Sequence, residues 1–413
     1  MNDLKYQKKN LMTEGPIFSR ILLFALPLLA GNLFQQLYSN VDAVILGHFA
    51  GSNALAGIGA GASVFNTVIS FSTGIASGAG VLIARFYGTG ETDKIKKAVH
   101  TSLVIALVLG ITISISGILC TPKLYSLIKV PTSVYDDAVQ YTRLYFVGIF
   151  FMVFYSMCSG ILNAAGNSKL SLLFLSVSSV VNVILDLLFV VRLHMGVSGA
   201  ALATDLSQLL SCALIFGYLL HCRELYHVSF RELKTDRRVL RTILLLSIPA
   251  GLQSAIMEFS NIPIQAGINT FDAAAVAGFT AYLRIDGFVW LPTVSIATAA
   301  ATFTAQNTGN TKRIRRGILI TCGMGLFLSA LSGGFILFNR QALISVFTTD
   351  PMTVYYGSVC AFFWSSFYWA LISYEVLLGV LRGFGHTFAT MVISLISTFF
   401  LRIIYMTVLM RSS

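Results

Sequence analysis

The sequence predicts an all-α polytopic membrane protein, and three observations lead to that fold class. Of the 413 residues, 56% are hydrophobic and only 11% are charged, whereas about a quarter of the residues of a soluble domain are charged. Charged side chains are absent from long stretches, among them 43–84, 287–311 and 317–339. Each stretch is longer than the roughly 20 residues that a helix needs to cross a bilayer. A β-barrel would instead show short segments of alternating hydrophobicity.

Eleven membrane-spanning helices are expected, and the basic residues predict their orientation. We place the spans at about residues 17–47, 54–84, 97–120, 138–163, 169–192, 198–221, 240–270, 274–304, 317–339, 353–381 and 387–410. The N-terminal tail and the loops after every second span hold twenty Lys and Arg residues, and the opposite loops hold five. Positive residues gather on the cytoplasmic side of membranes. We therefore expect an inner (plasma) membrane protein with a cytoplasmic N-terminus, and the net charge of +11 requires no nucleic-acid partner.

The two halves of the chain resemble each other. Pro27 and Pro249 lie 222 residues apart, and the stretches ARFYG (84–88) and AQNTG (305–309) lie 221 apart. Both halves begin on the same side of the membrane, which predicts a parallel repeat of two pseudo-symmetric six-helix lobes around a central cavity. We expect a first lobe at 1–222, a cytoplasmic connection at 223–241 and a second lobe at 242–413. By symmetry, a twelfth helix is expected to be missing from this chain.

Several other classes of function lack their motifs. The six cysteines include no CxxC pair and the six histidines no HxxxH pair, so no metal site is expected. The stretch GIGAGA (57–62) follows no predicted strand and precedes no Lys-Ser/Thr pair, which excludes a phosphate-binding loop and ATP-driven transport. A membrane-embedded enzyme would need an acid cluster such as DDxxD or a Ser/His/Asp set within the membrane. We therefore expect neither an enzyme nor a cofactor.

The first span carries an acid near its end. The run 26–47 contains Pro27 near its start and Asp42 near its end. An ionisable side chain at membrane depth is costly, so Asp42 indicates a functional site. Pro27 weakens the same helix and is expected to act as a hinge. The corresponding helix of the second half carries Glu258, although the position that matches Asp42 in the repeat is near Ile264.

A small polar cluster is predicted in the first lobe. Asn182 and Asp186 are one helical turn apart on the fifth span and face the same side. Thr204 lies on the sixth span, so these side chains and Asp42 converge if the first, fifth and sixth spans pack together. Two carboxylates, an amide and a hydroxyl suit a hard monovalent cation or a shared proton. The alternative is a hydrogen-bonded cluster that only joins helices. Asp205 must point away from the side that Thr204 faces, and no role is predicted for it.

The sequence resembles the MATE (multidrug and toxic compound extrusion) family of the MOP superfamily, in its bacterial NorM and DinF types. The similarity covers essentially the whole chain and includes GVLIARFYGTG (80–90), GILNAAGNSKL (160–170), VVNVILDLLFV (180–190) and LGVLRGFGHT (378–387). The resemblance implies a two-lobe exporter that exchanges amphipathic, mostly cationic organic compounds for H⁺ or Na⁺. It also implies that Asp42, Asn182, Asp186 and Thr204, with Tyr38 as a neighbour, form the ion-coupling site of the first lobe.

The resemblance suggests a second ion-coupling site in the other lobe. NorM-like members carry an acid on the seventh span, which Glu258 matches, and an aspartate on the tenth. Here Ile372 occupies the position of that aspartate, and Glu375, three residues later, is the candidate to replace it. This departure puts a site of the Na⁺ type in the second lobe in doubt.

Other polar groups at membrane depth have simpler interpretations. Gln35 and Gln36 are candidates to line the substrate cavity, and ordinary hydrogen bonding between helices is the alternative. On the eighth span, Arg284 and Asp286 are expected to form a local ion pair.

Two transport functions follow from these observations. The first is a secondary active multidrug efflux antiporter that acts as a monomer in the lipid bilayer on small organic cations or drugs. The alternative is a lipid-linked oligosaccharide flippase of the same superfamily, which would have a basic cavity for a pyrophosphate. The ionisable groups within the membrane are mainly acidic here, which favours cationic cargo and the antiporter.

Overall fold

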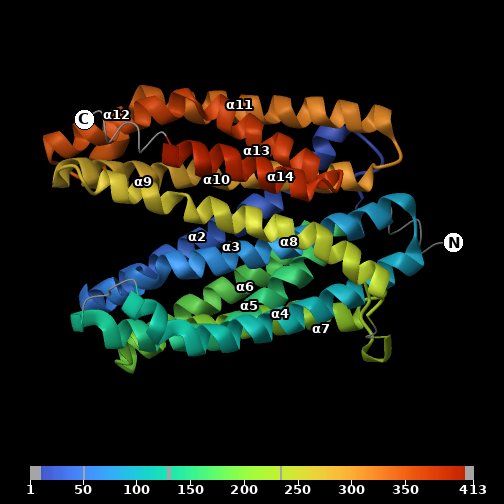
Figure 1. Ribbon diagram of the computed structural model, residues 1–413, viewed down its shortest axis with the longest axis horizontal. Coiled ribbons are helices and arrows are strands. Elements are labelled where there is room, and N and C mark those ends of the chain that lie inside the picture. The colour runs from blue at the N-terminus through green and yellow to red at the C-terminus, as the bar shows by residue number, and fades with distance from the viewer. Residues whose placement is uncertain (1–10, 50–51, 128–131, 233–234, 405–413) are drawn as a thin grey trace.

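The computed structural model describes residues 11–49, 52–127, 132–232 and 235–404, and within these ranges the regular elements are helices (Figure 1). Ten of the described helices are long and apolar enough to cross a membrane. The number is eleven if the bent pair α12 (Pro351–Ser366) and α13 (Tyr368–Gly383) counts as one span. The predicted all-α polytopic fold is confirmed.

The helices follow the predicted spans closely. The first half of the chain contains α2 (Ile17–Phe49), α3 (Ser52–Thr89), α4 (Thr92–Leu127), α5 (Thr132–Ala164), α6 (Ser168–Asp186) with its π-helical continuation η1 (Leu187–Arg192), and α7 (Gly196–His221). After a short 3-10 turn, η2 (Phe230–Glu232), the second half contains α8 (Arg237–Phe259), α9 (Asn261–Ile268), α10 (Ala273–Gln306), α11 (Thr311–Ser345), α12, α13, α14 (Thr387–Ser394) and the π-helix η3 (Leu395–Phe400).

The helices form two groups that meet along α3 and α8. In Figure 1, α4 to α7 lie on one side and α11 to α13 on the other, with α2, α3 and α8 between them. The largest cluster of buried apolar side chains joins α3, α4, α5 and α7, and includes Ile83 and Met157. A second cluster joins α10 to α13 and includes Tyr282 and Ile372. This arrangement confirms the two-lobe architecture, while the predicted lobe boundaries stay predictions.

Glycines allow the two groups to approach closely. A Cβ atom added at Gly74 of α3 would lie 2.5 Å from the carbonyl oxygen of Ala250, and one added at Gly78 would lie 2.4 Å from the Cα atom of Ser247. Both neighbours are backbone atoms of α8 and cannot rotate away. Small residues therefore set the distance between the two helices, as is common where membrane helices pack.

Two of the predicted spans are broken. The span predicted at 240–270 is divided at Ser260, where α8 ends and α9 begins. The span predicted at 353–381 bends by 51° at Phe367, between α12 and α13. Just before this bend, the hydroxyls of Ser365 and Ser366 donate to the carbonyls of Ala361 and Phe362. Serine side chains that bond back to the preceding turn favour helix bending, which hydrophobicity alone does not reveal.

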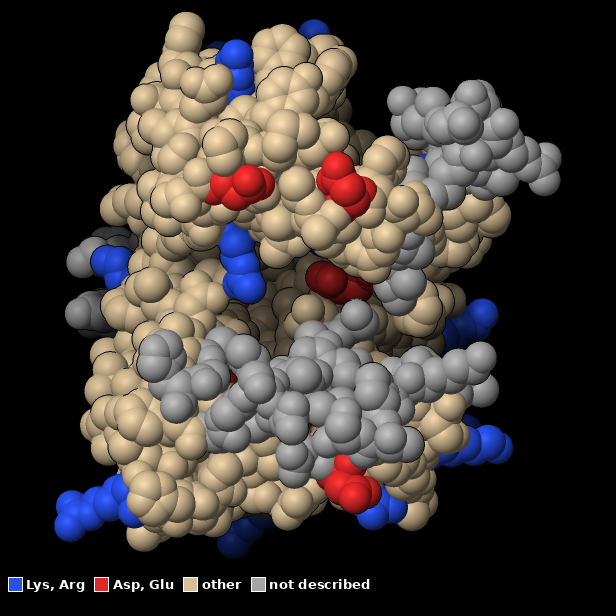
Figure 2. All heavy atoms as spheres, turned by 90° about the vertical axis from the view of Figure 1, so that its left-hand side faces the viewer, with Lys and Arg blue, Asp and Glu red and all other residues tan. Residues whose placement is uncertain are grey.

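The two ends of the bundle differ. One end, here called the basic end, carries the loops at 90–91, 165–167, 222–236, 307–310 and 384–386, which are near Arg85, Lys94–Lys97, Lys169, Arg237–Arg241, Lys312–Arg316 and Arg382. The connection between the halves docks there on α4, because Lys97 forms a 3.2 Å ion pair with Asp236. Figure 2 shows the opposite end, where the surface is hollowed between the two groups and an acidic side chain lies inside the recess.

We expect Gly78→Ala to destabilise the protein by about 1–3 kcal/mol, the usual cost of overpacking, because its Cβ would overlap the backbone of α8 at Ser247. The matched control is Gly217→Ala on α7, where an added Cβ meets nothing within 4 Å. Thermal unfolding in detergent, followed by size-exclusion chromatography, should give a lower Tm for Gly78→Ala only. Equal Tm values would show that the α3–α8 contact can be widened freely.

Candidate functional site

An acidic side chain lies in the outer part of α2, toward the end opposite the basic end. Asp42 is partly buried, and its Oδ1 atom has no hydrogen-bond partner among the described residues. Between Arg20 and Asp42 the helix contains no other charged residue, so no other charge of α2 lies within this stretch. Pro27 interrupts the backbone hydrogen bonds of the same helix, 15 residues earlier.

The predicted partners of Asp42 lie on α6, which packs against α2. Asn182 and Asp186 are 1% and 0% exposed, and among the described residues both polar atoms of each side chain lack hydrogen-bond partners. The carboxylates of Asp42 and Asp186 are close enough to interact electrostatically. Buried polar groups in native proteins are almost always hydrogen-bonded. Four unsatisfied atoms beside a second acid therefore make this group a candidate site for a proton or a cation.

The helix changes its geometry directly after Asp186. The six residues Leu187–Arg192 form a π-helix, which is wider than an α-helix. Such segments are rare and are frequent at functional sites. Here the π-helix shifts the register of the chain that follows Asp186, so the carboxylate is at the end of the regular part of α6.

Thr204 is buried on α7, which packs against α6. Its carbonyl accepts a hydrogen bond from the Ser207 hydroxyl at 2.7 Å. Within the described residues, the structure shows no hydrogen bond from Thr204 to Asp42, Asn182 or Asp186. Its part in the predicted cluster stays a prediction.

Tyrosines surround the acids, and most of them were not predicted from the sequence. Tyr38 interacts with Asp42 and Asp186. Tyr141 and Tyr145, one turn apart on α5, both interact electrostatically with Asp42. The rings of Tyr141 and Tyr145 have centroids 6.1 Å apart and pack on Phe65 of α3. We call the group Asp42, Asn182, Asp186, Tyr38, Tyr141 and Tyr145 the acid pocket. The spacing of Tyr141 and Tyr145 places both on one face of α5, but it does not show that this face meets the acids.

Asp205 also lies beside this group. Its carboxylate packs on the backbone of α5, because a Cβ atom added at Gly148 would lie 1.9 Å from its Oδ1. The carboxylate interacts with both Tyr141 and Tyr145. Asp205 thus points toward α5, the helix that carries Tyr141 and Tyr145 of the acid pocket.

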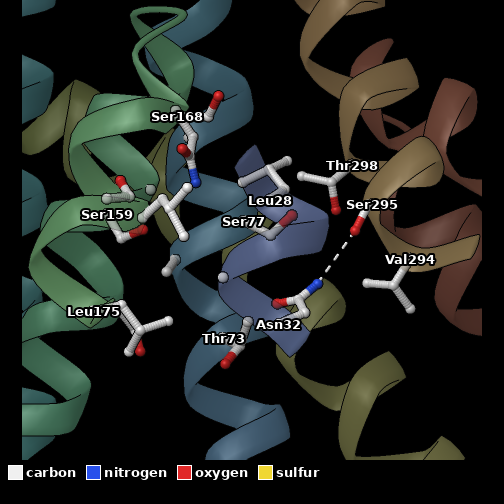
Figure 3. A pocket seen from close by; sticks show the side chains of 18 of the residues that line it. Leu28, Asn32, Thr73, Ser77, Ser159, Ser168, Leu175, Val294, Ser295 and Thr298 are labelled. Carbon is white, nitrogen blue, oxygen red and sulfur yellow. Dashed lines mark hydrogen bonds between the residues drawn. The ribbon is translucent and has the colours of Figure 1, made fainter. Parts of the chain in front are cut away.

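A cavity of about 270 Å³ lies between the acid pocket and the basic end (Figure 3). Residues of α2, α3, α5, α6, α7 and α10 line it, and none of the described lining residues is charged. Pro27 and Gln35 both line the cavity. Gln36 is exposed and is not among the lining residues, since it is turned by about 100° from Gln35 around the helix.

Neutral polar groups from both halves face this cavity. Asn32 of α2 donates to the Ser295 hydroxyl of α10 at 3.3 Å, which links the two halves across it (Figure 3). The Ser171 hydroxyl and Asn163 Oδ1 also line it and have no partner among the described residues. The cavity therefore offers hydrogen bonds without charge.

The acids predicted in the second lobe lie in separate surroundings. Glu258 of α8 is partly buried and accepts a 3.3 Å hydrogen bond from Ser70 of α3, at the contact between the two groups. Glu375 is 4% exposed on α13 and interacts with Arg382 of the same helix. The interactions that the structure shows do not join Glu258 and Glu375 into one site.

The expected ion pair between Arg284 and Asp286 is wrong. Asp286 accepts hydrogen bonds from the hydroxyls of Tyr282 and Tyr368 at 3.0 and 2.7 Å, and Arg284 is exposed. Residues two apart on a helix point in different directions, whereas Tyr282 is one turn from Asp286 on the same face.

Comparisons with known proteins identify the family. The MatE family model matches residues 27–188 and again residues 249–408, so the two matches begin at Pro27 and Pro249 and reproduce the internal repeat. The chain belongs to the MATE family. Members of this family are transporters and not enzymes, so the protein is a multi-pass membrane transporter.

Individual relatives are similar over most of their length. The probable multidrug resistance protein YpnP of Bacillus subtilis is 29% identical over 395 residues, which cover 94% of this chain and 88% of that protein. The probable multidrug resistance protein NorM of Thermotoga maritima is 24% identical, with 92% and 83% covered. A structure described as the outward-facing conformation of a MATE family transporter of the MOP superfamily matches with a TM-score of 0.87 and 23% identity, over 96% of this chain and 88% of that one. This likeness confirms the MATE fold.

The basic end of this MATE chain is closed by contacts between the halves. The Gln306 amide, at the end of α10, donates to the carbonyl of Ala164 at the end of α5, at 2.8 Å. Its oxygen accepts from the backbone N–H of Met12, also at 2.8 Å. Arg313 donates to the carbonyls of Met12 and Gly15. The segment after residue 10 thus covers the point where α5 and α10 meet.

We expect Gly88→Ala to weaken this closure, because its Cβ would lie 1.9 Å from the carbonyl oxygen of Gln306. The control is Gly309→Ala, at the matching position of the repeat, where an added Cβ meets nothing within 4 Å. In a cysteine-free background with Ser159→Cys in the cavity, alkylation from the basic end should be severalfold faster for Gly88→Ala than for Gly309→Ala. Equal rates would contradict the assignment of Gly88 to the closure.

Proposed function

We propose that the protein is a secondary active multidrug efflux transporter, which exports amphipathic organic compounds in exchange for H⁺ or Na⁺. The observation that carries this proposal is the acid pocket. Its two interacting carboxylates and its unsatisfied buried polar atoms lie on α2 and α6, and both helices also line a neutral polar cavity. The names of the relatives, such as the multidrug export protein MepA of Staphylococcus aureus, support the same function.

The coupling follows from electrostatics. Two carboxylates in a low-dielectric pocket repel each other, and a bound proton or monovalent cation removes most of that repulsion. Asp42 and Asp186 belong to α2 and α6, so occupancy of the pocket changes the preferred distance between these helices. Pro27 lines the cavity and weakens α2. A shift of the outer part of α2 is therefore transmitted to the cavity wall through a bend at Pro27.

The substrate would bind in the cavity of about 270 Å³. Its described lining combines apolar side chains such as Leu28 and Leu175 with the polar side chains of Asn32 and Gln35, which suits amphipathic compounds. The preference for cations that the resemblance implies has no carboxylate in this lining to support it. The flippase alternative would require basic side chains for a pyrophosphate, and the described lining contains none.

The orientation completes the proposal. Because basic loops lie on the cytoplasmic side, the basic end would face the cytoplasm and the acid pocket the outer half of the inner membrane. The cavity, closed at the basic end by Gln306 and Ala164, would then be in an outward-facing state of a monomer. In exchange, an ion from outside would enter the acid pocket as the drug is released.

Asp42→Asn should reduce drug efflux by at least about tenfold, because the neutral amide cannot load and release the coupling ion. The control is Asp136→Asn at the exposed start of α5, which should transport normally. The measurement is ethidium efflux from reconstituted vesicles under a pH gradient alone and then a Na⁺ gradient alone. The gradient that drives wild-type efflux identifies the ion, and unchanged efflux by Asp42→Asn would overturn the proposal.

A further inference from the structure

A groove on the surface of the second half, at the basic end, has no part in the proposed mechanism. It has a volume of about 680 Å³ and runs between α8 and the start of α14, which pack against each other (Figure 1). We call it the α8–α14 groove. Its lining consists of two arginines and of apolar side chains, namely Arg237, Arg241, Leu240, Leu244, Leu245, Ile248, Pro249 and Phe388.

The groove follows one face of α8 from the end of the bundle into the membrane. Arg237, Arg241, Leu244 and Ile248 recur every three or four residues, which is the spacing of one helical face. Both α8 and its apolar span begin at Arg237. At a rise of 1.5 Å per residue, Pro249 is roughly 18 Å further along the helix. The arginines are therefore at the level of lipid headgroups, and the apolar lining is at the level of acyl chains.

A proline shapes the inner end of the groove. Pro249 has no N–H group and cannot donate to the carbonyl of Leu245, one turn earlier on α8. The hydroxyl of Thr387, the first residue of α14, donates to that carbonyl instead, at 3.5 Å. The next residue, Phe388, is 65% exposed and lines the groove from the side of α14. α14 thus docks where the proline interrupts α8, and the groove lies beside this contact.

The two arginines of the groove are exposed, and the structure shows no ion pair or hydrogen bond of their side chains within the described part of the chain. The adjacent acid, Asp236, is engaged by Lys97 and by two backbone N–H groups of α8. At the matching positions of the first half, 222 residues earlier, the chain has Gly15 and Ser19. The pair of positive charges therefore belongs to the second half and is available to an external anion.

The matching surface of the first half indicates that this face meets lipid. Leu245 and Ile248 are 63% and 44% exposed, and their counterparts Leu23 and Leu26 on α2 are 56% and 48% exposed. These counterparts stay exposed although α7, the last helix of the first half, is present. A helix in the place of α7 in the second half would therefore leave the α8–α14 groove open to the bilayer.

We propose that the α8–α14 groove binds an anionic phospholipid, with the lipid phosphate between Arg237 and Arg241. One acyl chain then lies along Leu244, Ile248 and Phe388. Basic pockets between membrane helices bind anionic headgroups, and the planar fork of a guanidinium matches the oxygens of a phosphate. A zwitterionic phospholipid fits the apolar lining equally well but carries a positive group that the arginines repel. The site is separate from the cavity and the acid pocket, so it adds a lipid partner to the proposed transport.

The test detects lipid in the groove itself. The three native tryptophans are replaced by Phe, and Phe388→Trp supplies one fluorophore in the groove. The protein is reconstituted in vesicles of phosphatidylglycerol and phosphatidylcholine, in which one of the two lipids carries brominated acyl chains that quench tryptophan on contact. The quenching gives the affinity for phosphatidylglycerol relative to phosphatidylcholine at this place. We expect a preference of about fivefold or more, and equal affinities when Arg237→Gln and Arg241→Gln are combined.

The matched control is the combination of Lys312→Gln and Arg316→Gln. These exposed residues are also one turn apart at the start of a helix of the basic end, α11, so the variant loses the same charge elsewhere. It should keep the preference for phosphatidylglycerol. Quenching by brominated phosphatidylcholine alone should be equal in all variants, since the apolar lining is unchanged. Inorganic phosphate, added at constant ionic strength, should not reduce the preference, because it has no acyl chain to occupy the groove.

Four results would overturn the proposal: no preference with both arginines present, an unchanged preference without them, a preference lost in the α11 control, or displacement of the lipid by inorganic phosphate. Both leaflets of the vesicles contain both lipids, so the result does not depend on the orientation of the protein. Failure here is also distinguishable from failure of the proposed function, which is decided by efflux in Asp42→Asn.

Discussion

The repulsion between Asp42 and Asp186 is the interaction on which the proposed mechanism depends. The two carboxylates lie on different helices, α2 and α6, and interact in a buried environment. A charge in such an environment is expensive unless it is neutralised or paired. The described surroundings offer them tyrosines and an amide but no basic partner. Neutralisation by a mobile ion is the remaining way to lower this energy, which is what an ion-coupled transporter requires.

The cavity and the acid pocket both include residues of α2, but they differ in charge. The described residues lining the cavity are uncharged, and the acids lie further out along the same helix. In the proposed mechanism, the ion and the substrate therefore bind at distinct places and both act on α2. This separation permits exchange without direct competition for a carboxylate. Pro27 belongs to both parts, because it lines the cavity and interrupts the helix that carries Asp42.

The amount that the sequence could predict differs between the fold and the site. Long apolar stretches, basic loops and the repeat predicted the membrane helices and the two lobes, because each depends on local composition or spacing. The pairing of α2 with α6 followed from the family resemblance. Tyr141 and Tyr145 were missed because nothing in the local sequence says that α5 faces the acids. The bend at Phe367 was missed because hydropathy continues across it, and the Arg284–Asp286 pair was wrong because proximity in sequence was preferred to the direction of the side chains.

The repeat explains why neither lobe copies the site of the other. At the spacing of 221 residues, Asp286 corresponds to Phe65, which packs on Tyr141 and Tyr145. Tyr368, at the later spacing of 219, corresponds to Ile149, next to the Gly148 that contacts Asp205. In the first lobe an aromatic ring thus occupies the place of the acid, and the carboxylate arrives from α7. The scaffold is shared between the lobes, but the acids of the two lobes lie on different helices and meet different partners.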